Sequence, residues 1–216
     1  MLKFAATAKR APMNDAQPDY AALIMDYASG ALPPAFRLLV DVHFDFRPEA
    51  KLWAAQADCA GGALLEQMEP AALGATLLPP RLIEEPSLAD VVDPLAGVRA
   101  RIALAASGED GLAWRRRLIG FMDHRLPIPG ASLVKIPAGR AMPRHGHEGE
   151  ELTLVLRGAF EDERGTYQRG DLVFADAATE HTPRVTADDA CVCLIAETGG
   201  LKLRTWWGRA IAGWVH

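Results

Sequence analysis

The sequence has few cysteines and lacks long hydrophobic runs. Cys59, Cys191 and Cys193 are an odd number of thiols in 216 residues, which argues against the disulfide framework of a small secreted protein. No stretch approaches the roughly 18 consecutive apolar residues of a membrane helix. The apolar run near the N-terminus is also too short for a secretory signal peptide. We therefore expect a soluble, cytoplasmic protein that does not bind membranes.

Basic clusters are missing as well. The chain has 23 Lys and Arg against 28 Asp and Glu, which gives a formal net charge of −5. Binding to phosphate groups requires clustered Lys and Arg, so the composition argues against direct nucleic-acid binding. The sequence contains neither a glycine-rich phosphate loop nor a nucleophile elbow. An acidic chain of this kind can still bind a basic protein partner.

The hydrophobic pattern divides the chain into two parts. Residues 19–32, 33–46 and 48–68 have helical periodicity, with a bend expected at Gly61-Gly62, and another short helix is expected to begin near Ser87. After about residue 106, short strand-like runs alternate with Gly, Pro and Asp. The predicted fold class is therefore α + β, with a small helical bundle over residues 13–95 followed by an all-β domain over residues 106–216. The expected apolar core of the helical part consists of Leu23, Ile24, Tyr27, Leu38, Leu39, Phe44, Trp53 and Leu65.

A histidine cluster carries the strongest chemical signal. In an extended strand, residues of equal parity point to the same face, so His145, His147 and Glu151 can point together. An antiparallel neighbour can bring His181 opposite them. Imidazole and carboxylate ligands without a thiolate suit a divalent metal, namely Zn, Fe, Mn or Ni. A full tetrahedral shell would make the site structural, whereas a metal with open positions would support chemistry.

The spacing around this cluster resembles the cupin motifs. Gly139, His145, His147, Glu151 and Gly158 match every fixed position of the first motif. The second motif is looser: Gly170 and His181 are present, while Asp176 and Ala178 replace the usual proline and glycine. The resemblance covers about residues 112–210 and implies a double-stranded β-helix, or jelly roll, with His145, His147, Glu151 and His181 as metal ligands.

Both halves together resemble the ChrR-type anti-sigma factors. The resemblance rests on DYASGAL, GGALLE and WRRRL, on PRHGHEGEELTLVLRGAF over residues 143–160, and on the ending CVCLIAETGGLKLRTWWGRAI. It implies that the helical domain masks a sigma factor of the extracytoplasmic-function type. It also implies that a metal-binding cupin, most simply with zinc, helps to release the sigma factor under oxidative stress such as singlet oxygen.

The helical part departs from the family's zinc motif. His43 stands at the histidine position, but Arg47 and Ala50 replace the two cysteines. A structural zinc site needs about four ligands, so we expect that His43 binds no metal and that the helices are held together by packing alone. Arg47 and Lys51 are expected to be solvated, and Cys59 is expected to pack inside the bundle.

Two other functions remain open on the residues alone. A cupin with three histidines and one glutamate can be a metal-dependent dioxygenase or isomerase, with the helices as a lid or a dimerisation element. It can also sense a small molecule without turnover. Cys191 and Cys193 share parity and are expected to fill the barrel, while tryptophans near the C-terminus leave a homodimer possible. The leading prediction is a regulator without enzymatic activity.

Overall fold

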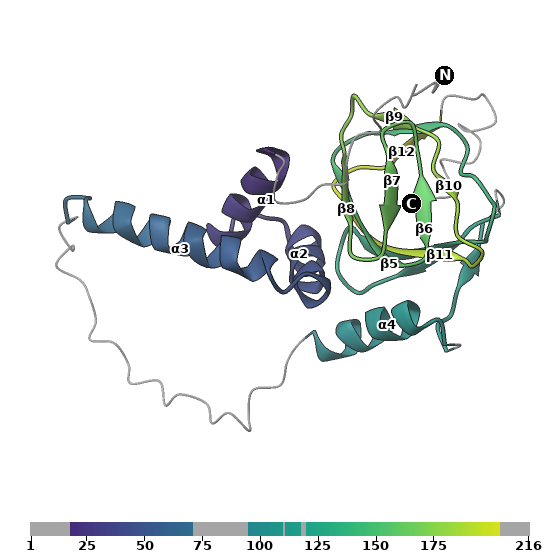
Figure 1. Ribbon diagram of the computed structural model, residues 1–216, viewed down its shortest axis with the longest axis horizontal. Coiled ribbons are helices and arrows are strands. Elements are labelled where there is room, and N and C mark those ends of the chain that lie inside the picture. Colours follow the sequence, from purple (N-terminus) through teal and green to yellow (C-terminus); the bar gives the residue numbers. More distant parts are fainter. Residues whose placement is uncertain (1–17, 71–94, 110, 118–119, 204–216) are drawn as a thin grey trace, which may run out of the picture.

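The computed structural model describes residues 18–70, 95–109, 111–117 and 120–203. Four helices precede a set of short antiparallel strands (Figure 1), which confirms the predicted α + β order. The helices are α1 (Pro18–Ala28), α2 (Pro34–Phe46), α3 (Ala50–Glu66) and α4 (Ala96–Ser107). Residues 13–17, the helix expected near Ser87 and the C-terminal tryptophans lie outside the described ranges. Within those ranges, no helix has both the length and the hydropathy needed to span a bilayer.

The helix boundaries follow from glycine and proline. Gly30, just after α1, has a φ of 76°, the left-handed conformation that ends many helices. Pro34 is the first residue of α2. An N–H group at this position would have no acceptor within the helix, so proline costs no hydrogen bond there. α3 runs through Gly61 and Gly62 as one continuous helix. The three predicted helical segments are thus all present.

The strands form the two layers of the predicted cupin barrel. One layer is a six-stranded sheet in the order β1-β2-β3-β11-β5-β8, and the other consists of two three-stranded sheets, β10-β6-β7 and β12-β4-β9. The strands are β1 (Arg115–Arg116), β2 (Met122–Arg125), β3 (Ala131–Ile136), β4 (His145–His147), β5 (Glu151–Arg157), β6 (Ala159–Glu161), β7 (Thr166–Gln168), β8 (Leu172–Ala175), β9 (Glu180–His181), β10 (Arg184–Val185), β11 (Cys191–Glu197) and β12 (Leu201–Leu203).

The helices and the barrel share one hydrophobic core. On β5, Leu152, Leu154 and Leu156 point away from the barrel interior and are completely buried. They belong to the same apolar cluster as Leu39 and Val40 of α2. Figure 1 shows α2 and α4 lying along this side of the sheet. Strands β5 and β11 of the six-stranded sheet are therefore buried on both faces, by the barrel interior on one side and by helices on the other.

α3 differs from the other helices because it projects away from the body of the molecule (Figure 1). Only Ala50 and Ala54, near its beginning, are buried. Trp53 and Leu65 were expected in the core, but they are 40% and 70% exposed. Cys59 is also exposed rather than packed. These expectations are wrong because no neighbouring element of the described chain covers the outer surface of α3.

His43 is buried between α1, α2 and the barrel. Its Nδ1–H donates to the carbonyl oxygen of Gly170 at 3.1 Å, and its Nε2 accepts a hydrogen bond from the Tyr20 hydroxyl at 3.1 Å. Burial lowers the pKa of His43 to about 4, although the hydrogen bond to Gly170 acts in the opposite direction. Arg47, expected to be solvated, instead pairs with Asp171 of the barrel at 3.1 Å.

The low pKa of His43 predicts that the protein loses stability in mild acid. In the unfolded chain this imidazole has a pKa of 6.5. The unfolded state therefore binds more protons between pH 6.5 and about pH 4, and stability falls as pH falls through this window. Between pH 7 and pH 5, His43 is expected to remove about 2 kcal/mol of unfolding free energy.

Urea titrations of wild type and His43→Gln at both pH values measure this contribution. The variant is expected to lose about 2 kcal/mol less than wild type between the two pH values. Other histidines with low pKa values, such as His145, remain in both proteins and cancel in the comparison. Equal losses in the two proteins would contradict the assignment to His43.

Candidate metal centre

Two antiparallel strands bring three histidines together. β4 carries His145 and His147, and β9 lies beside it with His181 directly opposite His145. The predicted antiparallel neighbour is therefore present. The imidazole nitrogens of the three residues lie within 4.8 Å of one another, and all three residues are buried. The Nε2 atom of His181 is 3.0 Å from Nε2 of His145 and 3.2 Å from Nε2 of His147.

The hydrogen bonds behind the rings decide which atoms face inward. His145 Nδ1–H donates to the carbonyl oxygen of Pro143 at 2.8 Å, and His181 Nδ1–H donates to Asp162 at 2.9 Å. His147 Nδ1 lies 3.4 Å from a carboxylate oxygen of Glu151. Because these oxygens only accept, each neutral ring carries its proton on Nδ1 and presents a lone pair at Nε2. Three lone pairs that face one another repel unless a cation lies among them, so this donor set fits a metal ion.

Glu151 lies beside the cluster rather than among the three Nε2 atoms. It is the first residue of β5, separated from β4 by a turn, so it belongs to the six-stranded sheet. Thr153 donates a hydrogen bond to its second oxygen at 3.0 Å. Burial alone would raise the pKa of Glu151, but the hydrogen bond from His147 and the nearby imidazoles hold it below its usual value. A buried, ionised carboxylate next to the three imidazoles adds a negative charge that favours a cation.

Burial keeps His145 neutral and ready to bind a metal. Burial, together with the smaller effect of the neighbouring His181, lowers the pKa of His145 to about 4. A neutral imidazole is the form that binds a metal, whereas the protonated form cannot. At neutral pH, His145 therefore needs to lose no proton before it can act as a ligand.

Asp162 holds His181 in place and was not identified from the sequence. Its carboxylate is completely buried and accepts hydrogen bonds from His181, from the backbone N–H groups of Arg164 and Gly165, and from the Tyr167 hydroxyl. Burial raises the pKa of Asp162, but the bonds from His181 and Arg164 outweigh it and hold the pKa well below its usual range. A permanent carboxylate behind a histidine fixes both its tautomer and its orientation.

Replacing Asp162 by asparagine is expected to weaken metal binding by about 10- to 100-fold. The amide keeps the size of the side chain but removes the charge that orients His181. Competition with a chromophoric chelator measures the affinity of the metal-free protein for zinc. Glu148→Gln is the matched control, because it removes the same charge from an exposed position next to His147. Equal affinities of the two variants would show that Asp162 does not position the histidine.

A cavity of about 690 Å³ adjoins the histidines inside the barrel. His145, Glu151 and His181 line one part of it, while Phe121, Met142 and Ile195 are among the apolar residues elsewhere in its wall. A cation at the three Nε2 atoms would therefore be accessible to a small molecule in the cavity. Cys191 and Cys193 are buried with their sulfur atoms 3.7 Å apart, which confirms that they fill the barrel.

Comparison with known proteins places the chain in one family. The ChrR cupin-like domain matches residues 128–199. The chain is 37% identical to the anti-sigma-E factor ChrR of Cereibacter sphaeroides over 193 residues, which is 85% of this chain and 90% of that protein. It also resembles ChrR in the crystal structure of the Rhodobacter sphaeroides SigE–ChrR complex, with a TM-score of 0.61 and 37% identity over 82% of this chain and 95% of that chain. The chain belongs to the ChrR family of anti-sigma factors.

Proposed function

We propose that this protein is an anti-sigma factor that binds a sigma factor with its N-terminal helices, within residues 13–95. The observation that carries this proposal is the exposed apolar surface of α1 and α3. We name it the α3 surface, and it consists of Met25, Leu52, Trp53, Leu64, Leu65 and Met68, which are 40% to 70% exposed. Exposed apolar patches on a soluble protein commonly mark a site for a protein partner, and five of these six residues lie on α3 or just after it. The related ChrR is found in complex with SigE.

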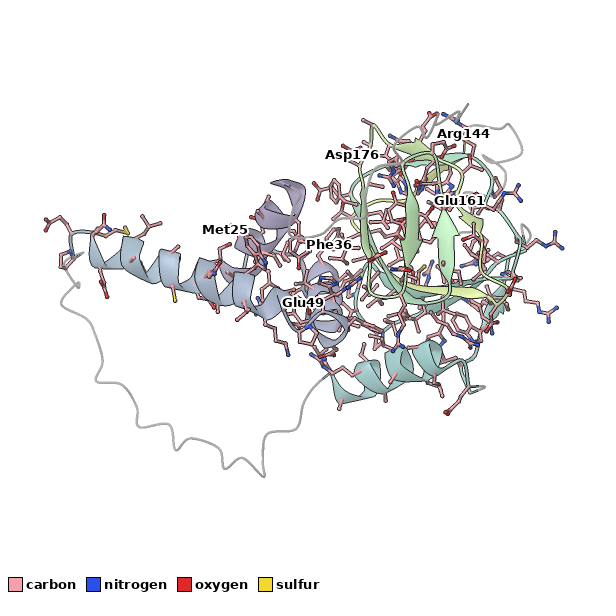
Figure 2. The ribbon with its side chains drawn as sticks, in the orientation of Figure 1. Met25, Phe36, Glu49, Arg144, Glu161 and Asp176 are labelled. Carbon is pink, nitrogen blue, oxygen red and sulfur yellow. The ribbon has the colours of Figure 1, made fainter. Side chains whose placement is uncertain are left out.

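The distal half of α3 presents this surface to solvent. From Asp58 to Glu66 almost every residue is exposed, and Figure 2 shows the side chains of this segment projecting into solvent. Burying one leucine side chain contributes about 1.5–3 kcal/mol. An apolar groove on a sigma factor that covers Leu64 and Leu65 would therefore gain several kcal/mol.

Charge supports the same choice of partner. Residues 18–70 contain eight acidic and only three basic side chains. A sigma factor binds promoter DNA, and DNA-binding surfaces are rich in Lys and Arg. An acidic helical module is complementary to such a surface and would itself repel DNA. We therefore propose that the protein acts through the sigma factor and does not contact nucleic acid directly.

We propose that the cupin, residues 106–216, binds a divalent metal and controls this interaction. The proposed ligands are His145, His147 and His181, with Glu151 as the fourth. Zinc is the metal we propose, because it is commonly bound by imidazole and carboxylate ligands in a four-coordinate shell. Fe, Mn and Ni bind similar ligands, and elemental analysis of the purified protein distinguishes them. The proposed signal is an oxidant that reaches the cation through the cavity, where the thioether of Met142 lies in the wall.

The direct test is capture of sigma factors by the full-length protein. Each extracytoplasmic-function-type sigma factor of the host is co-expressed with it, and the captured pair is assayed for inhibition of transcription. We expect capture of at least one sigma factor and inhibition of its transcription in vitro. If the zinc-loaded and metal-free forms both fail to capture any sigma factor, the proposal is wrong. Light scattering on the same samples shows whether the protein is a homodimer.

A further inference from the structure

The turn between β7 and β8 wraps the C-terminal end of α2. Three consecutive residues of this turn, Arg169, Gly170 and Asp171, each contact the helix. Arg169 places its guanidinium 4.9 Å from the centre of the Phe46 ring. The Gly170 carbonyl oxygen accepts the hydrogen bond from His43 at 3.1 Å, and Asp171 pairs with Arg47 at 3.1 Å.

The close approach of the two backbones requires glycine at position 170. Its φ of 88° lies in the left-handed region that residues with a Cβ rarely adopt. A Cβ added there would lie 3.3 Å from both Phe46 Cβ and Arg47 Nε. The turn is also anchored to the barrel, because the N–H of Gly170 donates to Val155 of β5 at 2.8 Å. The contact is therefore between a rigid part of the cupin and the end of α2.

A continuous series of contacts leads from this turn to the histidine cluster. Asp171 accepts a hydrogen bond from the backbone N–H of Gln168, the last residue of β7, at 2.9 Å. The preceding residue, Tyr167, donates its hydroxyl to Asp162 at 3.3 Å. Asp162 in turn accepts the hydrogen bond from His181 at 2.9 Å. Each step is either a hydrogen bond or a covalent link between neighbouring residues.

We propose that residues Arg169–Asp171 clamp α2 onto the cupin, and that Asp162, Tyr167 and Asp171 connect this clamp to the histidine cluster. The clamp holds the helical module by polar contacts with His43 of α2 and with Arg47, the residue that follows α2. The connection rests on the proposed metal site, because the event proposed to move His181 is the binding or loss of a cation. Loss of the cation would then loosen α1 and α2, which bear part of the proposed sigma-binding module.

Hydrogen exchange of the full-length protein, measured by mass spectrometry, tests the clamp. Arg47→Met removes the ion pair with Asp171 and retains most of the aliphatic side chain. Amides of α1 and α2 are expected to exchange about fivefold faster than in wild type. Arg99→Met is the matched control, because Arg99 forms an exposed ion pair with Asp45 on the same helix, α2. Exchange in the Arg47 variant equal to that in the Arg99 variant would refute the clamp.

The same measurement with and without zinc tests the connection. Stripping zinc from wild type is expected to speed exchange of α1 and α2 about fivefold, with no further increase in Arg47→Met. Tyr167→Phe removes only the hydroxyl that links β7 to Asp162, so its helices are expected to exchange slowly in both states. Equal exchange of loaded and stripped wild type would refute the connection. If elemental analysis finds no zinc uptake by wild type, the metal site and the connection both fail, while the Arg47 comparison still tests the clamp.

Discussion

Substitution of Leu64 and Leu65 by aspartate is expected to weaken the complex with the sigma factor at least 100-fold. These side chains are 64% and 70% exposed, so the substitution removes little packing from the free protein. In the complex, two apolar contacts worth about 1.5–3 kcal/mol each are lost and two carboxylates must lose their hydration. Calorimetric titration with the purified sigma factor measures the change, and an in vitro transcription assay shows relief of inhibition.

Gln67→Asp provides the control for this experiment. It introduces a carboxylate at the same end of α3 but leaves both leucines in place. Its affinity for the sigma factor is expected to fall by less than about tenfold, as for many single changes at an interface. Both variants should retain the melting temperature of wild type. If the double variant binds the sigma factor as tightly as wild type does, the α3 surface is not the binding site.

The second large effect is expected for the metal. His181→Ala is expected to reduce bound zinc from about one equivalent to less than about 0.1, because zinc sites in proteins need three or four side-chain ligands. His181 is the residue whose Nε2 lies within 3.2 Å of both other histidines. Elemental analysis after gel filtration measures the metal content. In the same variant, added zinc should no longer raise the melting temperature, since binding to the folded state is lost.

His124→Ala is the matched substitution outside the cluster. His124 lies on β2 and donates from Nδ1 to the carbonyl oxygen of Ala113, so its loss should leave the metal content unchanged. Circular dichroism of both variants shows whether the barrel is folded. Equal zinc content in folded His181→Ala and wild-type protein would refute the proposed ligand set.

Parity and spacing predicted that the three histidines lie together, but they assigned Glu151 to the wrong strand. Parity alone places His145, His147 and Glu151 on one extended strand. In the structure, a turn separates the first two from Glu151, which begins β5 in the other layer of the barrel. The histidine pair and the partner strand with His181 follow from local alternation, which sequence can reveal. The placement of Glu151 depends on how the two sheets close, which local alternation does not encode.

Other features depend on tertiary contacts that a single sequence does not contain. Nothing in the local sequence distinguishes Asp162 from the other acidic residues, because only the β6–β7 hairpin places it behind His181. Trp53 and Leu65 fit a helical periodicity, but periodicity does not tell whether a neighbouring element covers the apolar face. Arg47 lies at a position where the family motif has cysteine, and its partner Asp171 is 124 residues away in the chain. In each case the sequence does not show which distant segment of the chain lies beside the residue.

The pair Gly61-Gly62 in the exposed half of α3 affects how fast a complex can form and dissociate. Each glycine inside a helix costs about 1 kcal/mol relative to alanine, and no tertiary packing compensates for this cost in so exposed a segment. A partner must therefore hold the segment helical while bound, which offsets part of the gain from burying Leu64 and Leu65. The lower affinity would be expressed mainly as faster dissociation, and a sigma factor that leaves readily is suited to release on a signal.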